Sequence, residues 1–439
     1  MMRYETYKDT AIDWLGKIPA TWNVERIKNI GSVNGRVGWK ALKAAEYVES
    51  GFFFLSTPNI KEVEIDFVNV NYITAERYYE SPEIMLEVGD ILLVKDGSTL
   101  GIVNVIRCLP AKGTVNSSIA VLRVKKFHAV YGYYFLLSNY IQNVIQLKKD
   151  GMGVPHLFQK DINNFEILVP SLEEQIAIAN YLDTKTQAVD KKVRLLKKKI
   201  GYYQELRKSL IHETVTRGLD KNVKLKESGI DWIGQIPEHW EVRRLKDVGR
   251  LVLGKMLNTS AQINYELKPY LKSKNINWLY VDTDEVEEMY FNKNELVRYK
   301  IKKGDLLFSE GGEVGKTCIW NDEICECYIQ NSVHKFTAFS GHDSRYLMYH
   351  SFCLGASNYY DGIVNQVSIK HLTWEKLNIV LFIIPPLPEQ TQIADYLAEK
   401  ISKIDQIIAN IQTQIITLKE LRKTLINDVV TGKIKVIQD

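Results

Sequence analysis

The sequence of 439 residues contains two similar copies of one segment, and this internal repeat restricts its fold more than any other feature. The segment DWLGKIPATWNVERIKNIG, residues 13–31, returns as DWIGQIPEHWEVRRLKDVG at residues 231–249, which is 218 positions later. GDILLVKDGSTLG, from Gly89, returns as GDLLFSEGGEVGK, from Gly304, 215 positions later. A third pair follows further along the chain. Matches in the same order at nearly constant spacing predict a tandem duplication with a period of about 215 residues.

The third pair opens a long stretch at the end of each copy that has no proline beyond its first few residues. PSLEEQIAIANYLDTKTQAVD, residues 170–190, returns as PPLPEQTQIADYLAEKISKID at residues 385–405. Apolar residues then step by three and four in the same register in both copies, as the a and d positions of a heptad do. These positions are Leu182, Val189, Val193, Leu196, Ile200 and Tyr203 in the first copy, and Leu397, Ile401, Ile404, Ile408, Ile411, Ile415 and Leu418 in the second. Each helix would be roughly 60–70 Å long at 1.5 Å per residue.

A narrow apolar stripe on so long a helix needs a partner, and the matching stripe in the same chain is the nearest one. A local two-fold axis between the copies would make the two helices antiparallel. The alternatives are that each helix docks on its own domain or that two chains pair. The first part of each copy has short apolar runs broken by Gly, Pro, Asn and Ser, which indicate strands and turns. We therefore predict an α+β protein with two α/β domains, separated by two long helices that form an antiparallel coiled coil with pseudo-two-fold symmetry.

Composition narrows the class of protein further. Hydrophobic residues make up 45% and charged residues 25% of the chain, as in ordinary globular proteins. The sequence has no apolar run of about 20 residues, no secretory leader pattern, and five scattered cysteines, which together predict a cytoplasmic protein. The formal net charge of +4 is small for this length. A nucleic-acid partner would therefore be held by local basic patches or with the help of other subunits.

Outside the shared framework the two copies differ. GRVGWKALKAAEYVESGFFFL, from Gly35, has only a loose counterpart in GKMLNTSAQINYELKPYL, from Gly254. A common framework with different loops is what two readers of two different sites would have. Duplex DNA offers such sites, because half-sites one helical turn apart lie about 34 Å from each other.

These segments resemble the specificity subunits of type I restriction–modification systems. The resemblance is carried by DWIGQIPEHWEVRRLKDVG, by the GD turn segments and by PPLPEQTQIADYL, and it covers nearly the whole chain. Thr10-Ala11 replaces the Ser228-Gly229 of the second copy, a minor departure. The resemblance implies target-recognition domains at residues 1–170 and 221–385, and conserved helices at 171–220 and 386–439.

The resemblance also implies a function and partners. Such subunits read an asymmetric, bipartite DNA target and bind two methyltransferase subunits, joined in the full complex by the translocating endonuclease (restriction) subunits. The chemistry is then carried out by these partners. The alternatives are a coiled-coil scaffold that does not read DNA, and the recognition part of a methyltransferase or nuclease whose active site is not apparent in the sequence.

The segments of the sequence that resemble nucleotide-binding, zinc-binding or methyltransferase motifs each depart from the motif. GGEVGKT, from Gly311, is not a phosphate-binding loop, because the position that needs glycine is Glu310. Cys318, Cys325, Cys327 and His334 contain no C-x-x-C pair of the kind that holds structural zinc. The only Pro-Pro pair precedes a helix and lies in no methyltransferase motif. We predict no catalytic site, no metal and no cofactor.

The candidate DNA contacts are basic and polar residues on the loops that differ between the copies, since such side chains bind phosphates and base edges. They are Arg36, Lys40, Lys43, Lys95, Ser98, Thr99, Lys255, Lys272, Lys274, Ser309 and Glu310. For any one of them, a solvated surface side chain is the plainer interpretation. The basic run Lys197-Lys198-Lys199 is interpreted as a solvated helix face. The repeated tryptophans, Trp14 with Trp22 and Trp232 with Trp240, are interpreted as core residues.

Overall fold

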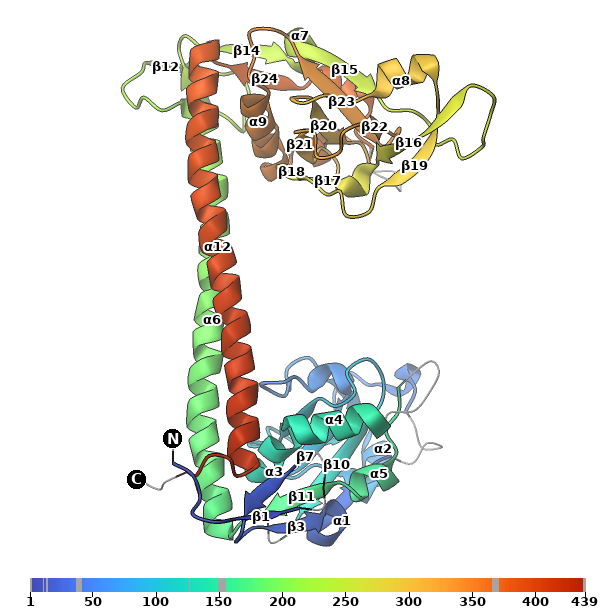
Figure 1. Cartoon of the computed structure of the whole chain (residues 1–439), viewed down its shortest axis with the longest axis vertical. Helices are drawn as coiled ribbons and strands as arrows, with labels where there is room; N and C mark the ends of the chain where they lie inside the picture. Colours follow the sequence, from blue (N-terminus) through green and yellow to red (C-terminus); the bar gives the residue numbers. More distant parts are fainter. Residues whose placement is uncertain are drawn as a thin grey trace. The chain divides into compact units, whose positions relative to one another are not determined.

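A computed structural model describes residues 2–10, 12, 15–36, 42–125, 127–148, 155–364 and 371–436 (Figure 1). The chain forms two compact units, Met1–Lys197 with Gln412–Asp439, here unit 1, and Lys198–Ile411, here unit 2. Each unit contains one globular domain and a stretch of both long helices. Helices and strands are mixed in both domains, as predicted for an α+β chain.

The domain of unit 1 is built on a four-stranded antiparallel sheet in the order β4-β10-β7-β8. A three-stranded sheet, β6-β5-β9, and two strand pairs, β1-β2 and β3-β11, complete it. The strands are β1 (Tyr7–Asp9), β2 (Lys17–Pro19), β3 (Asn23–Arg26), β4 (Gly31–Asn34), β5 (Phe52–Leu55), β6 (Asn71–Ile73), β7 (Ile91–Val94), β8 (Val103–Val105), β9 (Gly113–Val115), β10 (Ile119–Val124) and β11 (Glu166–Val169). The helices and 3₁₀ turns are α1 (Ile27–Ile30), η2 (Ala44–Glu46), η3 (Thr57–Asn59), α2 (Ala75–Tyr79), η4 (Pro82–Ile84), α3 (Ala129–Leu136), α4 (Asn139–Lys148) and α5 (Gln159–Asn163).

Unit 2 repeats this topology with the four-stranded order β15-β23-β20-β21 and the three-stranded order β19-β16-β22. Its pairs are β12-β13, β14-β24 and β17-β18. The strands are β12 (Leu225–Glu227), β13 (Gln235–Pro237), β14 (Glu241–Arg244), β15 (Gly249–Leu253), β16 (Tyr265–Leu271), β17 (Ile276–Asn277), β18 (Tyr280–Val281), β19 (Glu287–Asn292), β20 (Leu306–Ser309), β21 (Thr317–Ile319), β22 (Tyr328–Ile329), β23 (Val333–Ala338) and β24 (Leu381–Ile384). The helices and 3₁₀ turn are α7 (Leu245–Val248), η5 (Ser273–Asn275), α8 (Lys293–Tyr299), α9 (Ser344–Ala356), α10 (Tyr359–Ile363) and α11 (Trp374–Asn378).

Strand β7 explains how the apolar segment after each GD turn is used. Side chains alternate between the two faces of a strand. Ile91 and Leu93 therefore pack into the large core with α3, while Leu92 and Val94 pack against the three-stranded sheet on the other face. A strand covered on both faces needs an unbroken apolar run, and ILLV supplies it.

The long helices are α6 (Leu172–Arg217) and α12 (Leu387–Val430), drawn in green and red in Figure 1. In unit 1 the beginning of α6 and the end of α12 share the domain's core, for example through Leu182 and Val429. In unit 2 the roles are exchanged, and Leu397 of α12 lies in one core with Val215 of α6. The helices therefore run antiparallel in each unit, as predicted, and they also pack on both domains.

The heptad positions named from the sequence are all buried or half-buried. Their neighbours on the outer face are not, and Leu195 and Ile416 are 57% and 63% exposed. A narrow stripe of this kind suits a two-helix contact.

Candidate DNA interface

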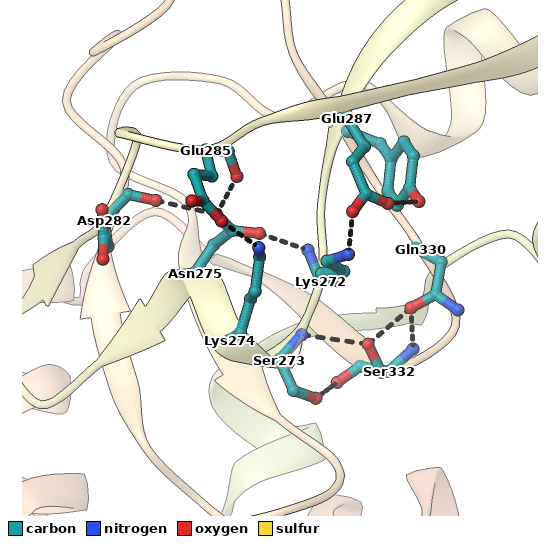
Figure 2. A network of polar contacts seen from close by, with 10 residues as sticks. Lys272, Ser273, Lys274, Asn275, Asp282, Glu285, Glu287, Gln330 and Ser332 are labelled. Atoms are coloured by element: carbon teal, nitrogen blue, oxygen red, sulfur yellow. Dashed lines mark hydrogen bonds and ion pairs between the residues drawn. The ribbon is translucent and has the colours of Figure 1, made fainter. Parts of the chain in front are cut away.

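A buried asparagine organises the loop after β16 in unit 2. Figure 2 shows that the Asn275 side-chain amide donates hydrogen bonds to the carbonyl oxygens of Asp282 and Glu285, at 2.9 and 3.1 Å. Its oxygen accepts a hydrogen bond from the backbone N–H of Lys272 at 3.0 Å. Because the side chain is buried and satisfied in this way, it fixes the loop from inside.

Unit 1 contains the same device. The Asn59 amide donates to the carbonyl oxygens of Asp66 and Asn69 at 3.2 and 2.7 Å, and its oxygen accepts from the Ser56 backbone N–H at 2.9 Å. The Asn-Ile dipeptide that recurs in the sequence is therefore a framework feature. The loop keeps its backbone in both copies while its surface side chains differ.

Those surface side chains are charged in unit 2. Lys274 Nζ lies 2.7 Å from Glu285 Oε2, and Lys272 forms an ion pair with Glu287 (Figure 2). The hydrogen bond from Lys274 lowers the pKa of Glu285, and the one from Lys272 lowers that of Glu287. Exposed pairs of this kind contribute little to stability, so a phosphate group can replace the glutamate at little cost.

The loop borders a hollow of about 580 Å³. Ser273 joins two sides of it, since its backbone N–H donates to Ser332 Oγ at 3.0 Å and its hydroxyl donates to the Ser332 carbonyl at 2.8 Å. The lining residues are Lys272, Ser273, Lys274, Ser309, Gly311, Gly312, Glu313, Lys316, Gln330 and Ser332. The fold thus places Ser309, which is distant in sequence from Lys272 and Lys274, in the wall of the same hollow.

The turns after β7 and β20 are each held by a later segment of the chain through an isolated β-bridge. The backbone N–H of Leu157 donates to the Lys95 carbonyl at 2.9 Å, and that of Leu372 donates to the Glu310 carbonyl at 2.9 Å. The histidine before each leucine contacts an acid of the turn: His156 pairs with Asp96, and His371 Nδ1 lies 3.8 Å from Glu310 Oε1. Sequence reasoning missed these histidines, although the His-Leu pair recurs 215 positions apart.

Glu310 occupies the position that Lys95 has in unit 1, so the two turns carry opposite charges at one backbone site. Burial raises the pKa of Glu310. Its Oε2 atom accepts no hydrogen bond from any of the described residues. Close by, burial lowers the pKa of His334 to about 4, so this histidine is neutral and offers the carboxylate no charge. Because Oε2 is itself buried, it is not open to a base amino group in this conformation.

Three of the candidate residues lie in the interior. Arg36 is 4% exposed and donates to Ser81 Oγ at 3.4 Å, and burial lowers its pKa. Lys255 is 9% exposed and lies 2.5 Å from Glu295 Oε1. Ser309 is buried and donates to the Gly311 carbonyl at 2.8 Å. In this conformation these side chains support the loops and have no surface to offer to DNA.

The other candidates lie at the surface to different degrees. Lys43, Ser98 and Lys274 are exposed, whereas Lys95, Thr99, Lys272 and Glu310 are half-buried. Lys40 and Trp14 lie outside the described residues. Trp22 and Trp240 are fully buried, and their indole N–H groups donate to Glu174 and Glu389 at 3.0 and 2.9 Å.

The part of the chain that the structure describes has neither a metal-binding cluster nor a membrane-spanning helix. No group of three or more His, Cys, Asp or Glu residues there could hold a metal ion. No helix in that part is long and apolar enough to cross a membrane.

The model of the type I restriction modification DNA specificity domain family matches this chain twice, over residues 19–200 and 237–420. The chain belongs to this family. The two matches coincide with the two copies found by self-comparison. The resemblance predicted from the sequence is therefore confirmed, and the chain is a type I restriction–modification specificity subunit.

Two relatives of this specificity subunit are similar along nearly their whole lengths. The type I restriction enzyme MjaVIII specificity subunit of Methanocaldococcus jannaschii is 27% identical over 96% of this chain and 94% of its own. The putative MjaX specificity subunit of the same organism is 25% identical over 98% of this chain and 97% of its own. A chain from a solved structure on complex assembly of the type I R-M system covers 95% of this chain and 99% of its own, with 17% identity and a TM-score of 0.72. That similarity shows a shared fold.

Proposed function

We propose that this specificity subunit reads an asymmetric, bipartite DNA sequence, one half with each domain, and has no catalytic site of its own. The observation that carries the proposal is the contrast between framework and side chains in the two units. Asn59 and Asn275 hold their loops by the same hydrogen bonds, and the turns after β7 and β20 have the same backbone contacts. At equivalent positions these turns present Lys95 in one unit and Glu310 in the other. Two similar readers with different chemistry suit two different half-sites.

We assign the recognition domains to residues 1–170 and 221–385, and the conserved helices to 171–220 and 386–439. Contacts to base edges would come from the turns after β7 and β20 and from the loop after β16. Lys272 and Lys274, whose present partners are exposed glutamates, would exchange them for phosphates and so fix the register on DNA.

The helices would serve as a spacer and as a docking surface for two methyltransferase subunits, with the translocating endonuclease (restriction) subunits joining the full complex. A partner that is present twice needs a surface that is present twice. The heptapeptides ELRKSLI and ELRKTLI meet this need, since Leu206 and Leu421 stand at equivalent positions and are 51% and 55% exposed.

The absence of catalysis is supported by the geometry of the one segment that resembles a nucleotide loop. Gly312 and Gly315 have φ of +74° and +78°, and Lys316 lies 2.9 Å from Glu313 within the turn between β20 and β21. Glycines with positive φ suit a tight turn. A lysine paired with a neighbouring glutamate supports a structural turn over a phosphate site.

A subunit that reads DNA would work in the cytoplasm, where the DNA is.

Methylation mapping tests this proposal. The chain is expressed with the methyltransferase of its own system in a host that lacks both, and modified adenines are located by long-read sequencing. We expect one asymmetric bipartite motif that is absent when this chain is omitted. If the assembled, active methyltransferase modifies the same sites without the chain, or if no motif appears, the chain is a scaffold and not a reader.

A further inference from the structure

Five cations on the helices of unit 1, Lys192 among them, have uncharged residues at the equivalent positions of the other copy. We call the other four the helix patch: Lys191, Arg194 and Lys197 on α6 and Lys419 on α12. All four are exposed. The equivalent positions of the repeat hold Gln406, Ala409, Gln412 and Gln204. The two helices share their heptad register and their framework, so this difference in charge is a property of the surface alone.

The helix patch carries an electrostatic cost. Lys191 and Arg194, and Arg194 and Lys197, are spaced three residues apart, so neighbouring like charges on the helix surface repel one another. Among the described residues, none of the four patch cations forms an ion pair.

Two lysines that do recur in both copies behave differently. Lys208 lies 2.9 Å from Glu205, and Lys423 lies 3.1 Å from Glu420. The duplicated lysines therefore have local counter-charges, whereas the helix patch has none among the described residues. A set of unpaired cations that repel one another calls for an anionic ligand.

Three of the patch cations border a hollow of about 460 Å³ in unit 1. Arg194, Lys197 and Lys419 line it together with Arg422 and Lys423, and the loop Glu62–Glu64 also lines it. Arg422 is engaged by Asp190 at 3.1 Å. The two glutamates make the hollow less positive than the helices alone would, but they form no ion pair with the patch. The cations are thus gathered in one place and remain free to bind.

We propose that the helix patch binds phosphates of the DNA between the two half-sites, which rests on the proposed function of the chain as a DNA reader. Two identical methyltransferase subunits need a duplicated surface, and the helix patch is not duplicated. A sugar–phosphate backbone needs no such symmetry, since it presents negative charge along its whole length. The patch adds affinity without reading bases, and it compensates for the small net charge of the chain.

The test gives unit 1 the side chains that the other copy already has at these positions: Lys191→Gln, Arg194→Ala, Lys197→Gln and Lys419→Gln. The repeat tolerates these residues in the same helical environment, so the variant is expected to fold. The matched control is Lys208→Gln with Lys403→Gln, which removes two exposed helix lysines that are paired with Glu205 and Glu399 and do not line the hollow. Each complex with methyltransferase is titrated with a duplex that carries the mapped motif, at several salt concentrations.

Each phosphate that the complex no longer neutralises should lower the slope of log K against log salt concentration by about 0.9. We expect a decrease of about 2–4 in the patch variant, a loss of affinity of at least tenfold at low salt, and an unchanged methylation motif. The control should keep the wild-type slope. An unchanged slope in the patch variant would overturn the inference, as would a slope that changes only because the variant binds methyltransferase more weakly.

The two proposals fail in different ways. If the wild-type complex shows no preference for the mapped duplex over a scrambled one, the reading function itself is wrong. If the wild type prefers that duplex and the patch variant matches it in slope and affinity, reading stands and the helix patch is a solvated face.

Discussion

Arg422 on α12 and Asp190 on α6 form an ion pair, with Nε 3.1 Å from Oδ1, and the same contact occurs in unit 2 with the helices exchanged. There Arg207 of α6 lies 2.8 Å from Asp405 of α12. Arg207 and Arg422 stand at equivalent positions of the repeat, and so do Asp190 and Asp405. Each helix therefore supplies the arginine once and the aspartate once. This exchange is what an antiparallel pair made from a duplicated helix requires.

The two ion pairs should differ in strength because they differ in burial. The side chains of Arg422 and Asp190 are 15% and 20% exposed, against 27% and 49% for Arg207 and Asp405. We expect Arg422→Met to lower the free energy of unfolding by about 2 kcal/mol and Arg207→Met by less than about 1 kcal/mol. Hydrogen exchange of the facing helix segments in each unit measures both. Equal losses of stability in the two variants would show that the difference in burial does not affect how much each ion pair contributes.

Glycines that follow the two long helices predict a second difference between the units. Gly218 and Gly432 have φ of +78° and +74°, in the left-handed region that often ends a helix. A Cβ on Gly432 would lie 2.3 Å from Pro19, whereas one on Gly218 would lie 3.1 Å from Trp240.

Alanine should therefore cost more at position 432 than at 218. We expect Gly432→Ala to destabilise unit 1 by about 2–4 kcal/mol, from strained φ together with the overlap, and Gly218→Ala to destabilise unit 2 by about 1–2 kcal/mol. Thermal unfolding of the two variants gives the order. The reverse order would mean that Pro19 moves aside without cost.

The sequence predicted the duplication, the α+β class and the antiparallel helices because these depend on local and repeated patterns. Heptad positions such as Ile404 and Ile411 can be recognised from the residues three and four places away. The burial of β7 on both faces likewise follows from its unbroken apolar run. Such features need no knowledge of which distant residues meet.

The candidate interface depends on distant partners, and there the sequence was less informative. Lys255 looks like a loop cation until Glu295, forty positions on, is found beside it. Arg36 looks exposed until the fold covers it with Ser81 and Val115. Neither partner is marked by periodicity or spacing. His156 and His371 could have been found, because the His-Leu pair repeats with the period of the chain.

Unit 2 should be the more acid-sensitive unit. Burial lowers the pKa of His334 to about 4 and of His350 to about 3, while Ile119 and Phe135 occupy the equivalent places in unit 1. Between the unfolded pKa of 6.5 and these folded values, the unfolded chain binds protons that the folded chain does not. Stability present above pH 6.5 is therefore lost as the pH falls toward 4.

The measurement is hydrogen exchange of β23 in unit 2 and β10 in unit 1 at pH 7 and pH 5, corrected for intrinsic rates. We expect protection to fall more in β23. Unit 1 contains His128, whose pKa burial also lowers, so a small loss is expected there. A larger loss in unit 1 would contradict the assignment of acid sensitivity to the two buried histidines.

Exchanging one turn should change one half-site. The turns that begin at Lys95 and Glu310 have equivalent backbone contacts, so KDGST at residues 95–99 can be replaced by EGGEV from residues 310–314. Removing or altering one base contact changes the binding free energy by about 1–3 kcal/mol. We expect methylation mapping to show a relaxed or altered base in one half of the motif. The other half serves as the internal control, and a change in both halves would contradict independent reading.

The length of the helices should set the distance between the half-sites. Removing residues 195–201 from α6 and 411–417 from α12 deletes one heptad from each helix and keeps both arginine–aspartate pairs in register. The deletion shortens each helix by about 10 Å. With base pairs about 3.4 Å apart, the preferred spacer should shorten by about three base pairs.

This shortening also turns the half-sites around the DNA axis relative to each other, because a full helical turn takes about 10 base pairs. The deleted variant should therefore either select the shorter spacer or lose binding to every spacer. A library of duplexes with the mapped half-sites and varied spacers separates these results. Binding that keeps the original spacer would show that the helices do not act as the ruler, and that the domains reach their half-sites by moving on the helix ends.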